Sequence, residues 1–377
     1  MVWVKFYMES GDLKWWLALR MVKGVGRGTF RALLNHFGEP KRLFDSKGDV
    51  NAEGVSRQVI SAVRGFKGWD RVAAELSLLK REGVRVVTIT DSEYPDLLKA
   101  TYDPPPFFYA KGDLSLLSSQ AVAVVGTRYP THYGRRMSET LGRDLALAGV
   151  TVVSGMARGC DAAAHRAALS AKGKTVAVLG TGINLVYPRE NRRLYEEIVA
   201  KGLLVSEFSM NTPPHHSNFP QRNRIISGLS LGVVVVEAPL RSGAIITANC
   251  ALDCGREVFA LPGEVTSVKS GGTNRLIRDG AMVVESCRDI VETLSLDTHS
   301  GSTATAEMAS DGAGQLPELE VEEEAIVRLL ADEEPLSVDG IIQKTGIPAQ
   351  RVLGLLLEME LKGIVRQYPG KYFARRV

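Results

Sequence analysis

A series of short apolar runs, accompanied by helical stretches, constrains the fold of this chain more than any other feature. The runs are VRVVTIT, VAVVG, VTVVSG, TVAVLG, LLVSE, GVVVVEA and EVFALPG, and the helical stretches include DRVAAELSLLKREG and DAAAHRAALSAKG. Continuous apolar strands that alternate with helices are typical of a parallel sheet whose two faces are both covered. The pattern predicts an α/β fold with an extended Rossmann-like sheet, and a ligand at the carboxyl ends of its strands.

Changes in this pattern predict four segments. Residues 1–67 form short helices with two glycine turns, in KGVGRG and AEGVSR, and resemble helix-hairpin-helix or SAM-like domains. Residues 68–293 carry the alternating strands and helices. Residues 294–317 are poor in large apolar side chains and rich in Ser, Thr, Ala and Gly, so we expect a flexible linker. Residues 318–377 contain three helical patterns and a hairpin with a Pro-Gly turn, which indicates a winged helix.

The two end domains each leave two interpretations open. A Gly-x-Gly turn lets the amides at a helix start approach a phosphate, but similar turns join helices that only pack together. The winged helix begins with an acidic helix, EEEAIVRLLADEE, so we expect it to contact either DNA or another protein. The main anion site is therefore placed in the central segment.

Charge and composition restrict the class of protein. The formal net charge is only +3, so a histone-like binding by bulk charge is excluded and any anion site must be local. Glu9 and Asp12 stand where a signal peptide needs an apolar core, and the run LGVVVVEAPL is far shorter than the roughly 20 residues of a membrane span. We expect a cytoplasmic protein without a membrane segment. Cys250 and Cys254 lack a second pair with zinc spacing, so no metal or cofactor is predicted.

The loops at the predicted strand ends carry several kinds of anion donor. GTR stands where a dinucleotide-binding loop would continue with glycines, and it offers backbone amides and a guanidinium, which suit a phosphate. SGMARGCD, YPRENRR, FPQRNR and EAPLRSG add arginines or a turn into a helix at the same edge. Their convergence predicts a groove longer than one nucleotide needs. The candidate nucleic-acid-binding residues are Gly126, Thr127, Arg128, Gly155, Arg158, Gly159, Arg192, Tyr195, Arg222, Asn223, Arg224, Ser242 and Gly243.

Two aromatic residues near these loops are assigned different roles. Tyr195 lies among the arginines of YPRENRRLYEE and is expected to stack on a base without selecting it, because every base has an aromatic face. Phe219 is expected to lie in the core beneath the arginines of FPQRNR.

Signals for catalysis are weaker. Asp161 and His165 are one helical turn apart, but no nucleophile motif accompanies them, so we expect a helix cap and a packed histidine. His215 and His216 are adjacent in a proline-bounded loop, are expected to point apart, and lack carboxylates at metal-binding spacing. The chain also lacks the GxxxxGK[ST] loop of ATP hydrolysis. No catalytic and no metal-ligating residue is predicted.

The ordered set of motifs resembles one family closely. VAVVGTR, VVSGMARGCDAAAHRAAL, TVAVLGTGINLVYPRENRRL, FPQRNRIISGLS, VVVVEAPLRSGAIITANCAL, GREVFALPG and SGGTNRLIRDGA are similar to the motifs of DprA, also called Smf, the DNA-processing protein of bacterial transformation. The resemblance covers roughly Trp69 to Ile290. Cys160 departs from it, because the family commonly has an aliphatic residue there. What the resemblance implies is a non-enzymatic single-stranded DNA-binding homodimer that protects incoming strands and loads RecA onto them, with DNA contacts at Arg128 and Arg192.

Two other classes of function stay open at this point. The lysine decarboxylase-like phosphoribohydrolases have a related Rossmann fold and act on nucleotides, but their PGGxGTxxE motif is absent where this chain has EAPLRSGAIITA. Such an enzyme would release base from nucleoside monophosphates. A purely structural adaptor would bind no DNA at any salt concentration.

Overall fold

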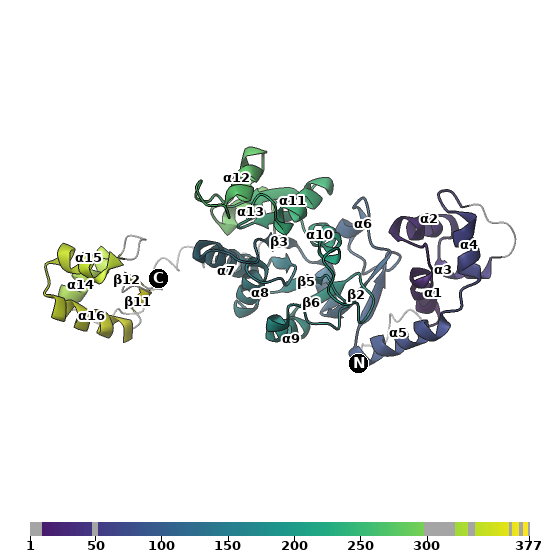
Figure 1. Cartoon of the computed structure of the whole chain (residues 1–377), viewed down its shortest axis with the longest axis horizontal. Helices are drawn as coiled ribbons and strands as arrows, with labels where there is room; N and C mark the ends of the chain where they lie inside the picture. The colour runs from purple at the N-terminus through teal and green to yellow at the C-terminus, as the bar shows by residue number, and fades with distance from the viewer. Residues whose placement is uncertain are drawn as a thin grey trace. The chain divides into compact units, whose positions relative to one another are not determined.

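The computed structural model of the chain describes residues 10–46, 52–297, 321–330, 336–361, 364–368 and 372–375. The chain divides into two compact units, Met1–His299 and Ser300–Val377, and each unit is described by itself (Figure 1). The predicted linker, residues 294–317, lies outside the described residues from position 298 onward.

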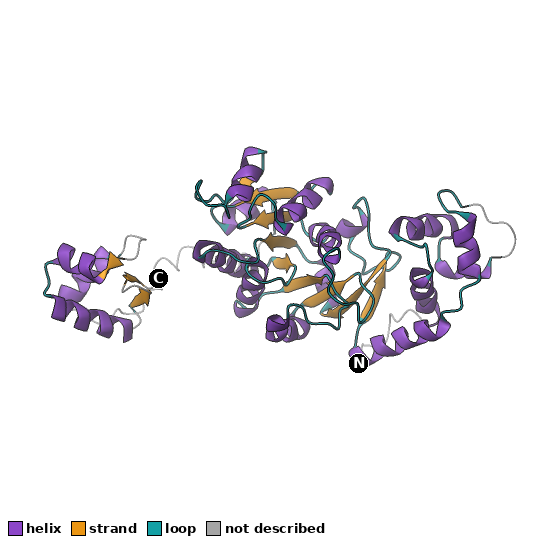
Figure 2. Cartoon of the chain, in the orientation of Figure 1, coloured by secondary structure: helices purple, strands orange, loops and turns teal. Residues whose placement is uncertain are grey.

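A nine-stranded sheet organises the larger unit (Figure 2). Its spatial order is β1-β2-β6-β5-β4-β3-β7-β8-β9, and the strands from β6 to β9 along this order are all parallel. The mostly parallel sheet confirms the predicted α/β, Rossmann-like fold. The strands are β1 Arg85–Thr88, β2 Phe107–Gly112, β3 Ala121–Val125, β4 Thr151–Ser154, β5 Thr175–Leu179, β6 Leu203–Ser206, β7 Gly232–Val235, β8 Glu257–Ala260 and β9 Met282–Val283.

Two features of this sheet do not follow from the apolar pattern. β2 runs antiparallel to β6, and β1 runs antiparallel to β2, so one edge of the sheet is mixed. The short edge strand β9 was not predicted, although it lies in the short apolar run AMVV; it has two residues, and both are exposed. Strand direction depends on the path of the connecting chain, which the pattern of one strand does not contain.

Helices cover both faces of the sheet, as a parallel sheet requires. Val122 of β3 packs in a layer with Leu141, whereas its neighbour Ala123 lies in the opposite layer with Ile225 and Ala248. The helices of this unit are α1 Ser10–Met21, α2 Arg27–Phe37, α3 Pro40–Asp45, α4 Arg57–Arg64, α5 Trp69–Glu82, α6 Asp96–Lys99, α7 His132–Leu147, α8 Cys160–Ser170, α9 Arg192–Lys201, α10 Asn218–Gly228, α11 Gly243–Asp253, α12 Gly271–Arg278 and α13 Cys287–Thr293, with 3-10 turns η1 Leu114–Ser118 and η2 Arg189–Asn191.

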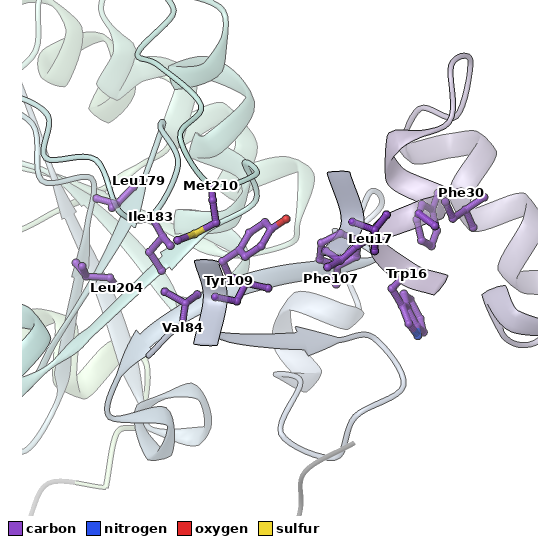
Figure 3. Packing of buried hydrophobic residues seen from close by; sticks show 14 of the residues in the cluster. Trp16, Leu17, Phe30, Val84, Phe107, Tyr109, Leu179, Ile183, Leu204 and Met210 are labelled. Carbon is purple, nitrogen blue, oxygen red and sulfur yellow. The ribbon is translucent and has the colours of Figure 1, made fainter. Parts of the chain in front are cut away.

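The N-terminal helices share an apolar cluster with the sheet (Figure 3). Trp16 of α1 and Phe30 of α2 both meet Phe107 of β2, with ring centroids 6.4 and 6.1 Å apart. The cluster continues through Tyr109, on the same face of β2 as Phe107, to Met210 (Figure 3). The residues before position 67 and those after it therefore share one continuous apolar cluster.

A charged network also joins α2 to the sheet. Arg224 of α10 donates to both carboxylate oxygens of Glu207 at 2.6 Å, and Glu207 is only 5% exposed. The first residue of α2, Arg27, pairs with Asp103 at 3.0 Å and with Glu207 at 3.6 Å. We call these four residues the Arg224 network. It places the start of α2, which follows the first glycine turn, against the larger sheet.

The smaller unit has the predicted winged-helix form. Its helices α14 (Val321–Leu329), α15 (Val338–Thr345) and α16 (Ala349–Leu361) surround a core that includes Ile326, Ile341, Leu356 and Phe373. Its sheet has the order β10-β12-β11, with β10 Leu336–Ser337, β11 Val365–Tyr368 and β12 Tyr372–Arg375. The antiparallel pair β11–β12 is the predicted hairpin, and β10 is an additional strand.

The close approach of α7 and α8 generates a stability prediction. Alanine is normally preferred over glycine inside a helix by about 1 kcal/mol. At Gly142 of α7, however, a Cβ atom would lie 2.5 Å from the carbonyl oxygen of Ala164, a backbone atom of α8. We expect Gly142→Ala to lower the free energy of unfolding by about 1–3 kcal/mol, since the two helices must separate.

Urea denaturation followed by tryptophan fluorescence measures this effect. All the tryptophans of the chain lie within its first 69 residues, so the signal reports the unfolding of the larger unit, which contains α7 and α8. Gly28→Ala in α2 is the control: a Cβ atom there meets nothing within 4 Å, so that variant should be at least as stable as the wild type. A Gly142→Ala protein that matches the Gly28→Ala protein in stability would contradict the packing argument.

Candidate nucleic-acid interface

The order of the strands reverses at β3. Strands β4, β5 and β6 follow one another on one side of β3, and β7 and β8, which come later in the chain, lie on its other side. The loops that follow β3 and β7 therefore separate at the carboxyl edge, and a hollow of about 610 Å³ lies between them. Arg128 and Tyr129 line it from the first loop, and Arg241, Ser242 and Gly243 line it from the second. This is the position where open α/β sheets bind their ligands.

The hollow continues along the sheet edge. A second hollow of about 540 Å³ lies toward α9, and a narrow one of about 60 Å³ lies beside the loop after β4. Tyr187 lines all three. We call the three hollows together the switch-point groove. The arginines that line it are Arg128, Arg158, Arg189, Arg192, Arg222 and Arg241, and the aromatic residues are Tyr129, Tyr187 and Phe219.

The GTR turn presents Arg128 to solvent at the centre of this groove. The guanidinium carbon lies 5.3 Å from the ring centroid of Phe219, and no carboxylate of the described residues pairs with it. Gly126 is required by close packing, because a Cβ atom there would lie 2.5 Å from the sulfur of Cys160. Gly159 caps α8 with φ +77°, and its backbone approaches the carbonyl of Thr127. The turn is thus held against the start of α8, and the guanidinium of Arg128 has no carboxylate partner among the described residues.

The other exposed arginines of the groove differ in their partners. Arg158 pairs with Glu190, whose carboxylate accepts a hydrogen bond from Arg158 Nη2 at 2.7 Å and raises the pKa of the guanidinium. Arg192 and Arg189 line the hollow near α9, and the described residues offer neither of them a carboxylate. Arg241 was not among the candidates predicted from the sequence. Its position directly before Ser242 and Gly243, in the loop after β7, is the signal that identifies it.

Arg222 is a structural residue and not an exposed DNA contact. It is 5% exposed, and its Nη1 donates to the carbonyl oxygens of Gly155, at 2.8 Å, and Val178. Burial lowers the pKa of this guanidinium to about 10, although the carboxylate of Asp161 opposes the shift. A Cβ atom at Gly155 would lie 2.4 Å from Arg222 Nη2, so glycine there makes room for the buried cation.

Arg224, unlike Arg222, lies outside the groove. It belongs to the Arg224 network on the side of α10 that faces the loop before β2. Residues two apart on a helix point about 200° apart, so Arg222 and Arg224 cannot serve the same groove. Asn223, predicted with them, is buried and donates from Nδ2 to the carbonyl oxygen of Gly243 at 3.1 Å. It lines the first hollow and fixes the start of α11.

The predicted positions of the two aromatic residues are reversed. Tyr195 is 8% exposed, packs in the apolar cluster with Leu194 and Ile198, and donates from its hydroxyl to the carbonyl oxygen of Ile183 at 2.8 Å. It cannot stack on a base in this position, because it lies on the buried stripe of an amphipathic helix. Phe219 is half-buried and lines the groove instead of lying in the core.

A buried polar cluster lies behind the loop after β4. Asp161 accepts hydrogen bonds from the amides of Gly155 and Ala157, at 3.2 and 3.3 Å, so it holds the loop before α8, while Gly159 is the helix cap. His165 is fully buried, as predicted, and its Nδ1 lies 2.6 Å from Thr175 Oγ1. That hydroxyl donates its proton to the carbonyl oxygen of Val152, so Nδ1 must carry the ring proton.

His215 and His216 do not point apart as predicted. Their ring centroids are 4.2 Å apart, and both residues line the first hollow of the groove. Within the described part of the chain, no group of three or more His, Cys, Asp or Glu residues is arranged to hold a metal ion. The described helices also include none that is long and apolar enough to cross a membrane.

Comparison with known proteins identifies this arrangement. Residues 85–295 match the family model for DNA recombination-mediator protein A, and residues 311–371 match the DprA winged helix domain. Protein Smf from Synechocystis sp. is 35% identical, and the alignment covers 98% of this chain and 100% of that protein. Protein Smf from Escherichia coli is 40% identical over 82% of this chain and 83% of its own length. The chain belongs to the DprA/Smf family of DNA-processing proteins.

Two solved DprA structures are similar to the chain. DprA from Streptococcus pneumoniae has a TM-score of 0.62 and 33% identity, and the match covers 74% of this chain and 97% of that one. DprA from Helicobacter pylori, whose structure is described for its single-stranded DNA binding mode, has a TM-score of 0.52 and 33% identity over 57% and 98% of the two chains. The family match at 85–295 contains every strand of the large sheet, so the switch-point groove lies within the DprA domain.

The buried His165 generates a pH prediction. Its Nε2 is buried without a hydrogen-bond partner, and burial lowers the pKa of the ring to about 3. The unfolded chain takes up this proton near pH 6.5, so it binds more protons than the folded chain between that pH and about pH 3. We expect the free energy of unfolding to fall as the pH drops through this window, by up to about 1.4 kcal/mol per pH unit from this residue.

His165→Gln should remove that contribution. The measurement is the difference in unfolding free energy between wild type and variant at several values from about pH 7 down to about pH 5, where most carboxylates stay ionised. The difference should shrink steadily as the pH falls. A constant difference across the window would mean that the pKa of His165 is the same in the folded and the unfolded chain, which would contradict the prediction.

Proposed function

We propose that this chain binds single-stranded DNA along the switch-point groove, with its arginines on the phosphates and with little base selectivity. The observation that carries the proposal is the charge of the groove. Four exposed arginines line the groove, and none of them pairs with a carboxylate of the described residues. Arg158, which pairs with Glu190, lines it as well. Among the described residues, the carboxylate that lines the groove is that of Asp161, and it is buried. The four are Arg128, Arg189, Arg192 and Arg241.

The shape of the groove supports a single strand over a duplex. Duplex readers insert a helix or a two-stranded ribbon into a DNA groove, whereas single-strand binders combine a concave cationic channel with aromatic side chains. The switch-point groove is concave, runs past α9, and has Tyr187 at the junction of its hollows. The single-stranded DNA binding mode of the Helicobacter pylori relative, which shares the fold of this domain, supports the same choice.

The remaining parts of the proposal follow from the family. We expect the chain to act in the cytoplasm as a homodimer, to protect single strands without catalysing a reaction, and to load RecA onto them. RecA filament nucleation on coated single strands, with and without this protein, tests the loading step. Incubation with nucleoside monophosphates tests the alternative of a nucleotide hydrolase, because that activity would release free base.

The principal experiment compares oligo-dT with duplex of equal length over a range of salt concentrations. We expect tighter binding of oligo-dT and an affinity that falls with salt, since phosphate contacts release counterions. Equal affinity for the two DNAs at moderate salt would overturn the proposal.

Arg128→Ala tests the site itself. Loss of one charge-assisted phosphate contact of about 1.5–3 kcal/mol should weaken binding to oligo-dT by roughly ten-fold to a hundred-fold. The slope of log affinity against log salt should decrease by about 0.7, whatever the oligonucleotide sequence. The melting temperature should change little, because Arg128 is exposed, has no carboxylate partner among the described residues, and contacts the Phe219 ring in an exposed cation–π pair of only about 0.5–1 kcal/mol.

Arg224→Ala is the matched control, because it removes an arginine from the same predicted set but outside the groove. It leaves Glu207 buried without its closest cation, so we expect a loss of about 3–5 kcal/mol of stability and an unchanged salt slope. An Arg128→Ala protein that melts early and keeps the wild-type slope would contradict the phosphate contact.

A further inference from the structure

Tyr187 occupies a particular place in the switch-point groove. It lies in the loop between β5 and α9 and is 40% exposed, although tyrosine rings normally bury most of their apolar surface. Among the described residues, it alone lines all three hollows. Its ring therefore meets any strand that passes from the arginine of the GTR turn toward α9.

The ring is supported from behind by a built stack. Phe219, at the start of α10, stacks against Tyr187 with ring centroids 5.5 Å apart and an interplanar angle of 29°. Phe219 in turn rests on Gly180, where a Cβ atom would lie 2.6 Å from the ring. The guanidinium of Arg128 lies over the Phe219 ring at 5.3 Å. The start of α10 and the loop after β5 thus fix the position of one exposed aromatic ring.

This stack matches the chemistry of a nucleotide. A nucleotide presents a phosphate and an aromatic base within one repeat, and the groove offers cations and an exposed ring side by side. A tyrosine face accepts any base, because stacking does not depend on the hydrogen-bonding edge. A ring that is already held in place also loses little conformational entropy when a base covers it.

We propose that Tyr187 is a nucleobase-stacking residue of this groove and that Phe219 is the positioning residue that holds its ring. The assignment rests on the proposed binding of single-stranded DNA. Tyr187 takes the stacking role that was predicted from the sequence for Tyr195. Its contact with a base is uncharged and is made in addition to the phosphate contacts of the arginines.

Tyr129 is the competing candidate. It is 67% exposed and lines two of the three hollows. Its hydroxyl interacts with Arg158, and no ring of the described residues stacks against it. A side chain without such support must be ordered by the DNA itself, which makes it the poorer platform.

The experiment measures how tightly each protein variant binds two oligonucleotides of equal length and equal charge, oligo-dT and a fully abasic strand. The measured quantity is the ratio of the two affinities at one salt concentration. We expect wild type to prefer oligo-dT by about five-fold to a hundred-fold, because stacking of one base contributes about 1–3 kcal/mol. Tyr187→Ala should bring the ratio close to one by weakening only the binding of oligo-dT, and Tyr187→Phe should keep the wild-type ratio.

Three further variants complete the test. Phe219→Leu should lower the ratio, whereas Arg128→Ala should weaken both oligonucleotides and keep it. Tyr102→Ala, an exposed tyrosine outside the groove hollows, should change nothing. A wild-type ratio in Tyr187→Ala, or its loss in Tyr129→Ala instead, would overturn the assignment while leaving DNA binding intact. Failure of the wild type to bind either strand would overturn the proposed function and the assignment together.

Discussion

The buried guanidinium of Arg222 is the interaction on which the groove depends. A cation that is removed from water must find acceptors, because an unpaired buried charge costs several kcal/mol. Arg222 finds them in the backbone carbonyls of Gly155 and Val178, which belong to the ends of two neighbouring strands. Asp161, beside it, takes the amides of Gly155 and Ala157. The pair holds the loop after β4 in place, and this loop forms one wall of the groove.

The segment FPQRNR shows how one short sequence serves three purposes. Phe219 forms part of the groove wall, Arg222 supports the floor, and Arg224 joins α10 to the loop before β2 and to the N-terminal helices. Helical geometry separates these roles, because each residue is rotated by about 100° from the previous one. An arginine in this segment therefore either supports the floor of the groove or connects α10 to its neighbours, according to its helical position.

The proposed binding part of the sheet edge is distinguished by arginines without carboxylate partners, and not by the number of arginines. Arg224 is neutralised by Glu207, and Arg158 by Glu190, whereas Arg128 and Arg192 face the groove with no carboxylate partner among the described residues. An unpaired guanidinium keeps its full attraction for a phosphate, but a paired one must first lose its partner. This difference gives a chain of net charge +3 a strongly cationic groove.

Much of this protein follows from the sequence alone. The alternating apolar runs determine the parallel sheet, and GTR determines an arginine at the end of β3, because strand patterns and loop positions are local properties. Tertiary structure decided the rest. Tyr195 is buried while Tyr187 is exposed, and Arg241 joins Arg128 across the point where the strand order reverses. Which side chains share a groove depends on contacts between residues far apart in the chain, and the local pattern around any one of them does not contain that information.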